Sequence, residues 1–396
     1  MVKILLIGAS LRYNLGGPSI LLSVTKILRS VFPNSHLTFI SPAPYDSSLD
    51  PREYLLDEIV VRPENALKRL MSLVKRIMKT NILIDIRGII FTDKFKASPL
   101  FYMFEYFYFL IGKLLGKYVV KYISDMGPFN NLWNRLFAKL YLNRIDIIFA
   151  RSYETERHLR KIGIKTPIFV FPDVAFILDP DEEDVRKARR ELQILLEGMK
   201  CRRVVGVSVS HTITKFEKTR GLYLKVMSNI IDYLTKKWNS CVVLIPNEIS
   251  PYMSENDLSI AEKIHNLISD ERRVRILRRE YNAKHLKSII GLCEVLIGSR
   301  YHSIVAALSQ GIPVIAIGWH HKYRAVLSLF NCENFVFDID DLDLNKIYKA
   351  IDYILENNAK IREQIIKKLK YIIKNVYLTG NIIKLSFYSN HGKYRK

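Results

Sequence analysis

Short apolar runs alternate with amphipathic segments through the first half of the chain. Helical patterns lie between most of the runs, among them 18–31, where Pro18 suits a first helical turn. Strands separated by helices form a mostly parallel sheet that helices cover. We therefore predict an α/β, Rossmann-like domain over residues 1–178. Its strands are expected at 2–8, 36–40, 81–86, 117–124, 145–151 and 167–173.

A second alternation follows a strongly charged stretch at 179–203. We predict a charged helical linker over 179–200, a second Rossmann-like domain over 201–375 and a basic tail over 376–396 that frays from residue 384. The simplest architecture is two doubly wound domains that face a cleft, with ligands bound beyond the carboxyl ends of the strands. Strands are expected at 204–210, 241–247, 274–278, 294–300 and 313–319, and helices at about 219–237, 256–269, 281–292 and 302–310.

One segment, 98–123, departs from this alternation because it carries an aromatic-rich run from Leu100 to Leu115. Glu105, Gly112 and Lys113 interrupt the run, so it does not fit the roughly 20 apolar residues of a spanning helix. We favour a helix buried against a sheet. The alternative is a helix that lies on a membrane surface, which positive charge would assist.

Charge and composition narrow the classes of partner. The chain has 396 residues, of which 49% are hydrophobic, and a formal net charge of +22, so it has ample core and favours anionic partners. Such partners include nucleic acids, membrane surfaces and phosphorylated or carboxylated small molecules. Basic residues are spread through the helices and no zinc-finger or RNA-binding signature occurs, so we expect no nucleic-acid partner.

The cysteines and the N-terminus bear on the compartment. No C-x-x-C pair occurs among Cys201, Cys241, Cys293 and Cys332, so we expect no zinc site and instead buried free thiols in a reducing compartment. The first apolar run is too short for a signal peptide. We therefore predict a cytoplasmic enzyme, and leave open an association with the inner face of the membrane.

Polar side chains follow several strands of the second domain, and parallel strands end at one edge of their sheet. At that edge these side chains would surround one anion. The guanidinium of an arginine binds carboxylate or phosphate through two parallel hydrogen bonds. A helix N-terminus near residue 302 would add partial positive charge. The side chains are Ser208, Ser210, Asn247, Arg300, His302, His320, His321 and Lys322.

A glycine-rich turn in the first domain is the second candidate for ligand binding. Asn14, Gly16 and Gly17 precede a helix and could approach an oxygen-rich ligand closely, although a plain tight turn explains them equally well. The turn is not G-x-G-x-x-G, so it is poor evidence for a dinucleotide. No metal-ligand cluster, paired carboxylates or nucleophile elbow occurs, and we expect no metal and no cofactor.

The stretch GSRYHSIVAALSQGIPVIAIGWHHK, Gly298 to Lys322, resembles the polysaccharide pyruvyl transferase family. That family carries G-x-R-x-H, a small-residue helix, G-[IV]-P-V-I and then a lysine. Two departures affect the acceptor-binding side of the site, which the first domain is expected to help build. Residues 85–93 have a single glycine where the family often has several, and Pro18 follows the turn where the family often has an acidic residue. Weaker matches occur in order at 14–17, 124–129, 150–155, 159–164 and 171–176.

The resemblance implies a glycosyltransferase-B-like fold and a transferase that moves pyruvate from phosphoenolpyruvate onto a sugar as a cyclic ketal. The acceptor would belong to a cell-surface glycan or a lipid-linked oligosaccharide. We expect His302 to be the general acid that protonates the vinyl carbon, and Arg300 to clamp the donor. Lys322, His320 or His321 would hold the departing phosphate, and Asn14, Ser210 and Asn247 would make weaker contacts.

Two alternatives stay open. A nucleotide-sugar-dependent glycosyltransferase of the same two-domain fold would also need arginine and lysine near its diphosphate. A non-catalytic peripheral membrane homologue would have kept the fold and lost the chemistry. The departures in the first domain and the aromatic segment motivate this second alternative.

Overall fold

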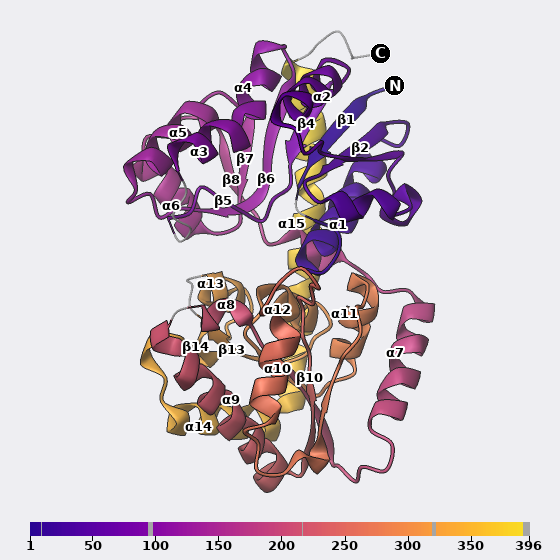
Figure 1. Ribbon diagram of the computed structural model, residues 1–396, viewed down its shortest axis with the longest axis vertical. Helices are drawn as coiled ribbons and strands as arrows, with labels where there is room; N and C mark the ends of the chain where they lie inside the picture. The colour runs from indigo at the N-terminus through magenta and orange to yellow at the C-terminus, as the bar shows by residue number, and fades with distance from the viewer. Residues whose placement is uncertain (9, 94–97, 216, 319–321, 391–396) are drawn as a thin grey trace. The chain divides into compact units, whose positions relative to one another are not determined.

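The computed structural model describes residues 1–8, 10–93, 98–215, 217–318 and 322–390 (Figure 1). The chain forms two compact units, each built on a parallel sheet. Unit 1 comprises Met1–Arg12, Ile20–Val174 and Lys374–Lys396. Unit 2 comprises Tyr13–Ser19 and Ala175–Ile373. The glycine-rich turn, expected in the first domain, therefore belongs to unit 2.

Unit 1 contains an eight-stranded parallel sheet in the order β3-β2-β1-β4-β6-β7-β8, with β5 paired to β6. All six predicted strands are present. β3 and β5 were missed because β3 is a half-buried edge strand and β5 has only two residues. The strands are β1 (Lys3–Ile7), β2 (His36–Ser41), β3 (Glu58–Val61), β4 (Ile82–Asp85), β5 (Ile89–Ile90), β6 (Tyr118–Met126), β7 (Ile147–Ala150) and β8 (Ile168–Val170).

Helices of 7 to 16 residues connect these strands. They are α1 (Gly16–Val31), α2 (Ala66–Met78), α3 (Pro99–Glu105), α4 (Phe107–Leu114), α5 (Leu132–Leu142) and α6 (Tyr153–Lys161). Short 3₁₀ helices occur at Pro44–Ser48, Pro51–Tyr54 and Val174–Ile177.

The aromatic segment forms the two helices α3 and α4. Tyr102, Tyr108 and Phe109 are buried in the core of unit 1, which confirms the predicted core helix for this part of the segment. Gly112 lets α4 approach the sheet closely, since a Cβ there would lie 2.9 Å from Val119. Within the described residues, none of the helices combines the length and the apolar character needed to cross a bilayer.

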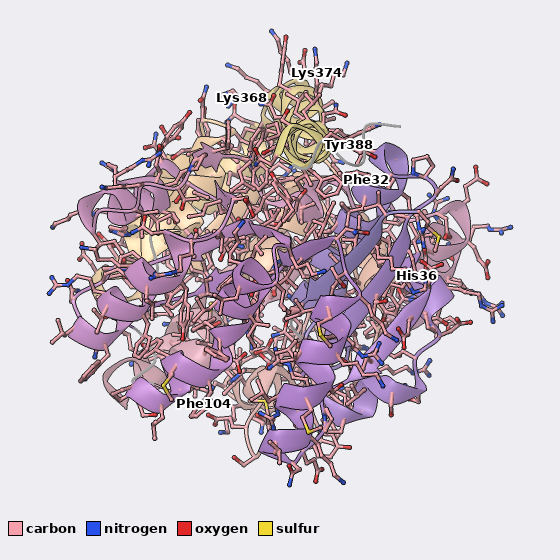
Figure 2. The ribbon with its side chains drawn as sticks, turned by 90° about the horizontal axis from the view of Figure 1, so that it is seen from above. Phe32, His36, Phe104, Lys368, Lys374 and Tyr388 are labelled. Carbon is pink, nitrogen blue, oxygen red and sulfur yellow. A yellow bond between two sulfur atoms is a disulfide. The ribbon has the colours of Figure 1, made fainter. Side chains whose placement is uncertain are left out.

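The C-terminal helix α15 (Asn358–Asn390) corrects the expectation of a frayed tail. Ile383 and Phe387 are fully buried, and Phe32 lies beside Tyr388 with 6.3 Å between ring centroids (Figure 2). The polar residues Lys384 and Ser386 between these apolar positions hid the helical spacing. The predicted fraying is therefore wrong for residues 384–390.

Unit 2 contains a six-stranded parallel sheet in the order β11-β10-β9-β12-β13-β14. Five of its strands were predicted, and β14 (Val336–Asp338) was not. The others are β9 (Arg203–Ser208), β10 (Ser240–Leu244), β11 (Val274–Ile276), β12 (Val295–Gly298) and β13 (Val314–Gly318). The helices are α7 (Glu182–Leu195), α8 (His211–Thr214), α9 (Glu217–Trp238), α10 (Asp257–His265), α11 (Ala283–Gly291), α12 (Tyr301–Leu308), α13 (Lys322–Ser328) and α14 (Leu344–Glu356), with 3₁₀ turns at Glu271–Arg273, Glu333–Phe335 and Ile339–Asp341.

The segment expected to be a charged helical linker, 179–200, contains the helix α7, as predicted, but it is part of unit 2 rather than a linker. Ala188 and Leu192 of α7 are buried in the unit 2 core, and α7 packs against α11. The two apolar residues are four positions apart and so share one face of the helix. The surrounding charges hid this short apolar stripe.

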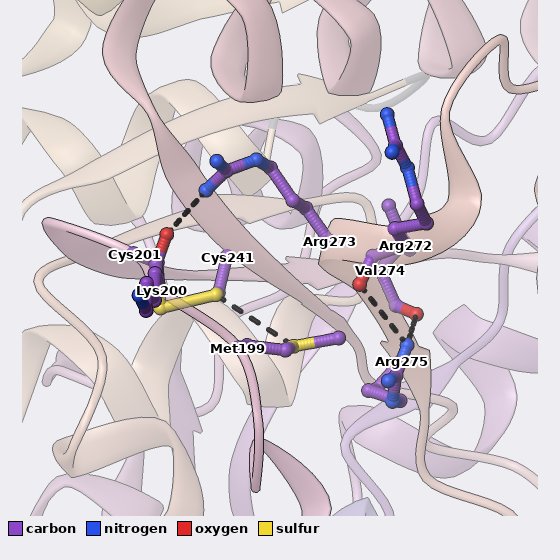
Figure 3. The surroundings of a disulfide bond; sticks show 8 residues. All are labelled: Met199, Lys200, Cys201, Cys241, Arg272, Arg273, Val274 and Arg275. Carbon is purple, nitrogen blue, oxygen red and sulfur yellow. Dashed lines mark hydrogen bonds between the residues drawn. A yellow bond between two sulfur atoms is a disulfide. The ribbon is translucent and has the colours of Figure 1, made fainter.

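Two of the four cysteines form a disulfide bond, Cys201–Cys241, which joins the segment before β9 to the start of β10 (Figure 3). The expectation of free thiols is wrong for this pair, because adjacent strands bring together residues that lie 40 positions apart. It is confirmed for Cys293 and Cys332, which are free and buried.

Candidate functional site

The candidate site lies at the carboxyl edge of the unit 2 sheet. β9 pairs with β10 on one side and with β12 on the other, and all three strands are parallel. The strand order therefore reverses at β9, and the crevice at such a switch point is where α/β sheets bind ligands. The residues predicted after these strands thus meet at one edge of the sheet.

Arg300 is the residue before α12, but its side chain does not cap that helix. Its Nε donates to Asp257 Oδ2 at 2.7 Å, and its Nη2 donates to Asp257 Oδ1 at 2.5 Å and to Glu248 at 2.7 Å. Nη2 also lies 2.6 Å from His211 Nδ1. Nη1 makes no hydrogen bond within the described part of the chain. The guanidinium is thus anchored on one side and keeps one nitrogen for a ligand.

Opposite charges keep Arg300 and Asp257 ionised despite their burial. Burial alone would lower the pKa of Arg300, but the carboxylates of Asp257 and Glu248 raise it above its usual range. Burial would likewise raise the pKa of Asp257, yet Arg300 and His211 hold it below its ordinary value. Two carboxylates face one guanidinium, so the cluster is not a ready-made cation for the donor. The geometry makes Arg300 a fixed donor of hydrogen bonds.

Asp257, which the sequence analysis missed, organises three strand ends. Its carboxylate accepts the backbone N–H of His211 at 2.9 Å, of Asn247 at 3.2 Å and of Glu248 at 3.0 Å. These residues follow β9 and β10, and Arg300 follows β12. Asp257 is the first residue of α10, where an acidic residue is ordinary, so nothing in the sequence marked it as fully buried.

His302 is the second residue of α12, and its ring lies directly against Gly16. A Cβ at Gly16 would be 2.4 Å from His302 Nδ1, so only glycine fits at this position. Tyr301 contacts the ring edge-on, with 5.3 Å between centroids. Gly16 and His302 were both predicted site residues, and the structure brings them together. Gly17 follows Gly16 in the first turn of α1.

Backbone pairing fixes the glycine-rich turn beside the loop after β10. Asn14 forms an antiparallel bridge with Glu248, and the N–H of Leu15 donates to the carbonyl of Asn247 at 3.3 Å. The Asn14 side chain accepts the N–H of Gly16 at 3.1 Å. The predicted residues Asn14, Gly16 and Asn247 therefore belong to one constellation with His302.

A small cavity adjoins His302. Its volume is about 20 Å³, enough for roughly one water molecule, so phosphoenolpyruvate does not fit inside it. Asn247 and the buried Lys287 are among its lining residues. Lys287 donates to the backbone carbonyl of Leu178, which fixes its ammonium group in unit 2.

The remaining predicted site residues are Ser208, Ser210, Lys322, His320 and His321. Ser208 donates to Ser303 at 2.8 Å and so ties β9 to α12, and the backbone N–H of Ser210 donates to the Tyr223 hydroxyl at 3.1 Å. Lys322 begins α13, nine-tenths buried, with its Nζ 5.4 Å from the ring centroids of Tyr301 and of Tyr323. His320 and His321 lie outside the described residues.

Unit 1 carries its own buried charges near the carboxyl edge of its sheet. Arg151 pairs with Asp125 and, at 2.7 Å, with Asp173. Lys121 donates to Asp85 at 2.8 Å, and burial lowers the pKa of Lys121 to about 8. Asp125, Arg151 and Asp173 lie in segments that resemble the family, but the sequence analysis assigned them no role. Among the described side chains no cluster of three or more metal-ligating groups occurs.

Comparisons with solved structures show the fold. Anabaena HepE in complex with UDP-glucose superposes with a TM-score of 0.63 at 13% identity, covering 99% of this chain and 100% of that one. The UDP-GlcNAc 2-epimerase of Methanocaldococcus jannaschii superposes with a TM-score of 0.61 at 13% identity, covering 93% and 100%. These neighbours confirm the predicted glycosyltransferase-B-like α/β fold.

Comparisons of sequence show the family. The amylovoran biosynthesis protein AmsJ of Erwinia amylovora is 21% identical, over 97% of this chain and 99% of the relative. The sequence profile of the polysaccharide pyruvyl transferases matches residues 14–321, from the turn at Asn14 through α12 and β13. The chain therefore belongs to the polysaccharide pyruvyl transferase family.

Proposed function

We propose that this protein transfers pyruvate from phosphoenolpyruvate onto a sugar as a cyclic ketal, in the biosynthesis of a polysaccharide. The observation that carries the proposal is the arrangement at the carboxyl edge of unit 2. There His302 lies against Gly16, Arg300 is anchored with Nη1 uncommitted, and Lys322 is held close to Tyr301. A proton donor, an oriented N–H group of Arg300 and the ammonium group of Lys322 suit a small substrate that carries a phosphate and a carboxylate.

The residues have distinct roles in the proposed reaction. His302 gives a proton to the vinyl carbon of phosphoenolpyruvate, while a sugar hydroxyl bonds to the adjacent carbon. The bond from that carbon to the phosphate oxygen then breaks, and a second hydroxyl takes its place to close the ketal. The two hydroxyl protons balance the one on the new methyl group and the one on the released phosphate.

Arg300 serves as a positioning clamp. Because Asp257 and Glu248 fix its orientation, its free Nη1 can donate to the donor's carboxylate without reorganising first. Lys322, whose ammonium group lies beside Tyr301 and Tyr323, supplies positive charge for the departing phosphate. No metal and no cofactor is part of this proposal.

The acceptor is proposed to be a sugar of a cell-surface glycan or of its lipid-linked precursor. Support comes from the family and from the relative whose name refers to amylovoran biosynthesis. Phosphoenolpyruvate is a metabolite of the cell interior, so we propose that the reaction takes place in the cytoplasm.

Isothermal titration with phosphoenolpyruvate, UDP-glucose and UDP-GlcNAc tests the donor. We expect saturable heat with phosphoenolpyruvate. The affinity should fall at least tenfold in Arg300→Lys, because lysine lacks the planar guanidinium group. His265→Ala, which changes an α10 histidine of the same unit, is the control and should bind normally. Heat with a UDP-sugar and none with phosphoenolpyruvate would show a glycosyltransferase instead.

A further inference from the structure

Unit 1 exposes a group of large apolar side chains on helices α2, α3 and α5, which we call the apolar face. Phe104 is 69% exposed, Leu67 is 66% exposed and Trp133 is 44% exposed, so these side chains are not part of the core. Figure 2 shows Phe104 on the outer side of its helix. The face comprises Leu67, Leu70 and Met71 of α2, Leu100, Phe101 and Phe104 of α3, and Leu132, Trp133 and Leu136 of α5.

Contacts between the helices join them into one layer. Tyr102 of α3 stacks on Phe137 of α5 with 6.3 Å between centroids, and Phe137 packs on Trp133 at 6.5 Å. At the other end, Arg62 just before α2 pairs with Glu105 of α3 at 3.3 Å. The helix α4 packs against all three. The exposed side chains therefore belong to one layer of four helices.

The charged residues of this layer are basic with one exception. Glu105 is the only acidic residue in α2, α3, α4 and α5, and Arg62 and Arg87 both pair with it. Lys68, Lys75 and Arg135 have no acidic partner within the described part of the chain. The basic residues of these helices are Lys68, Arg69, Lys75, Arg76, Lys113, Arg135 and Lys139.

We propose that the apolar face docks on an anionic lipid surface. Exposed Phe, Trp and Leu side chains beside lysines and arginines, with a single acidic residue that is already paired with arginines, are the pattern of helices that lie at a bilayer interface. A protein partner is disfavoured because lysine is depleted at protein interfaces. The rings of Phe101, Phe104 and Trp133 enter the headgroup region while Lys68 and Lys75 face lipid phosphates. This surface is independent of the donor site and would hold the enzyme where a lipid-linked acceptor lies.

Flotation of the full chain with vesicles tests the proposal. We expect binding to vesicles of phosphatidylcholine mixed with phosphatidylglycerol, and much weaker binding to phosphatidylcholine alone or at about 1 M salt, where screening is strong. Lys68→Gln with Lys75→Gln should weaken the partition coefficient about 25-fold, from roughly fivefold per basic residue. Phe101→Ser with Phe104→Ser should weaken it at least tenfold.

The control is Tyr353→Ser with Ile366→Ser, two exposed apolar residues of unit 2, which should float like the parent. The far-ultraviolet circular dichroism spectrum and the urea unfolding midpoint of each variant show whether the fold is retained, and neither depends on lipid or phosphoenolpyruvate binding. A parent chain that stays unbound, or variants of the apolar face that float unchanged, would overturn the proposal. Self-association abolished by Phe104→Ser, without lipid binding, would assign the face to a second copy and also overturn it.

Discussion

Replacing Asp257 by Asn should disrupt the candidate site and destabilise unit 2 together. The carboxylate binds both Nε and Nη2 of Arg300 and accepts the backbone N–H groups of His211, Asn247 and Glu248. Asparagine removes the negative charge and turns one acceptor into an N–H₂ group that faces other donors. The loops after β9 and β10 would lose their shared anchor.

The expected cost follows from burial. Breaking a fully buried ion pair costs about 3–5 kcal/mol, because it leaves the partner charge uncompensated. Glu248 still pairs with Arg300 at 2.7 Å in the variant, which favours the lower part of this range, about 3 kcal/mol. The matched control is Asp352→Asn, which removes a partly exposed carboxylate that Lys237 contacts at 2.8 Å. Its loss should cost about 1 kcal/mol.

Urea unfolding of the three proteins measures these costs, and titration with phosphoenolpyruvate measures the site. Asp257→Asn should also weaken phosphoenolpyruvate binding at least tenfold, since Arg300 loses its orientation, whereas Asp352→Asn should bind normally. If Asp257→Asn loses no more stability than Asp352→Asn and binds phosphoenolpyruvate like the parent, Asp257 is not the organising residue that the geometry indicates.

Three further predictions concern the fold and the site. Gly16→Ala places a Cβ 2.4 Å from the imidazole of His302, the proposed acid, and should abolish ketal formation. The control Gly221→Ala, where the added Cβ meets open space, should raise the free energy of unfolding by about 0.5–1 kcal/mol and leave turnover unchanged. Equal turnover in the two variants would contradict the packing of His302 against Gly16. The pKa of Asp257 lies below its value in the unfolded chain, so its contribution to stability is present above about pH 4 and is lost as the pH falls through the lowered pKa. Below about pH 4 the urea midpoint of the parent should therefore fall more steeply with pH than that of Asp257→Asn. Parallel plots of midpoint against pH for the two proteins would argue against an ionised carboxylate. Alkylation in denaturant without reductant should label two thiols, and four labelled thiols would exclude the disulfide. Cys201→Ser should lower the free energy of unfolding by up to about 4 kcal/mol, because the disulfide closes a loop between residues 40 positions apart.

Much of the fold follows from the sequence because its strands are buried and apolar. β1, β4 and β12 read as short uninterrupted apolar runs, which parallel strands covered on both faces require. β14 and β3 were missed because they are short edge strands with partly exposed residues. Helix α7 was predicted as a helix but assigned to a linker, because only Ala188 and Leu192 are buried among its charged residues.

The site was only partly predictable for a different reason. Strand ends identified Arg300, His302 and Asn247, since parallel strands bring their carboxyl ends together. The role of Asp257 depends on how α10 returns to the sheet, which no local pattern encodes. The placement of Gly16 against His302 likewise depends on a turn that joins unit 2 from far away in the sequence.

The reaction itself is the central claim, and mass spectrometry of the product tests it most directly. The purified protein is incubated with phosphoenolpyruvate and the cell's own lipid-linked or polysaccharide acceptor fraction, beside His302→Ala as the inactive control. The account predicts that the parent protein adds the mass of pyruvic acid less one water to a sugar and releases one phosphate for each ketal, and that His302→Ala does neither. An unchanged acceptor, or addition of a hexose from a UDP-sugar under the same conditions, would contradict it.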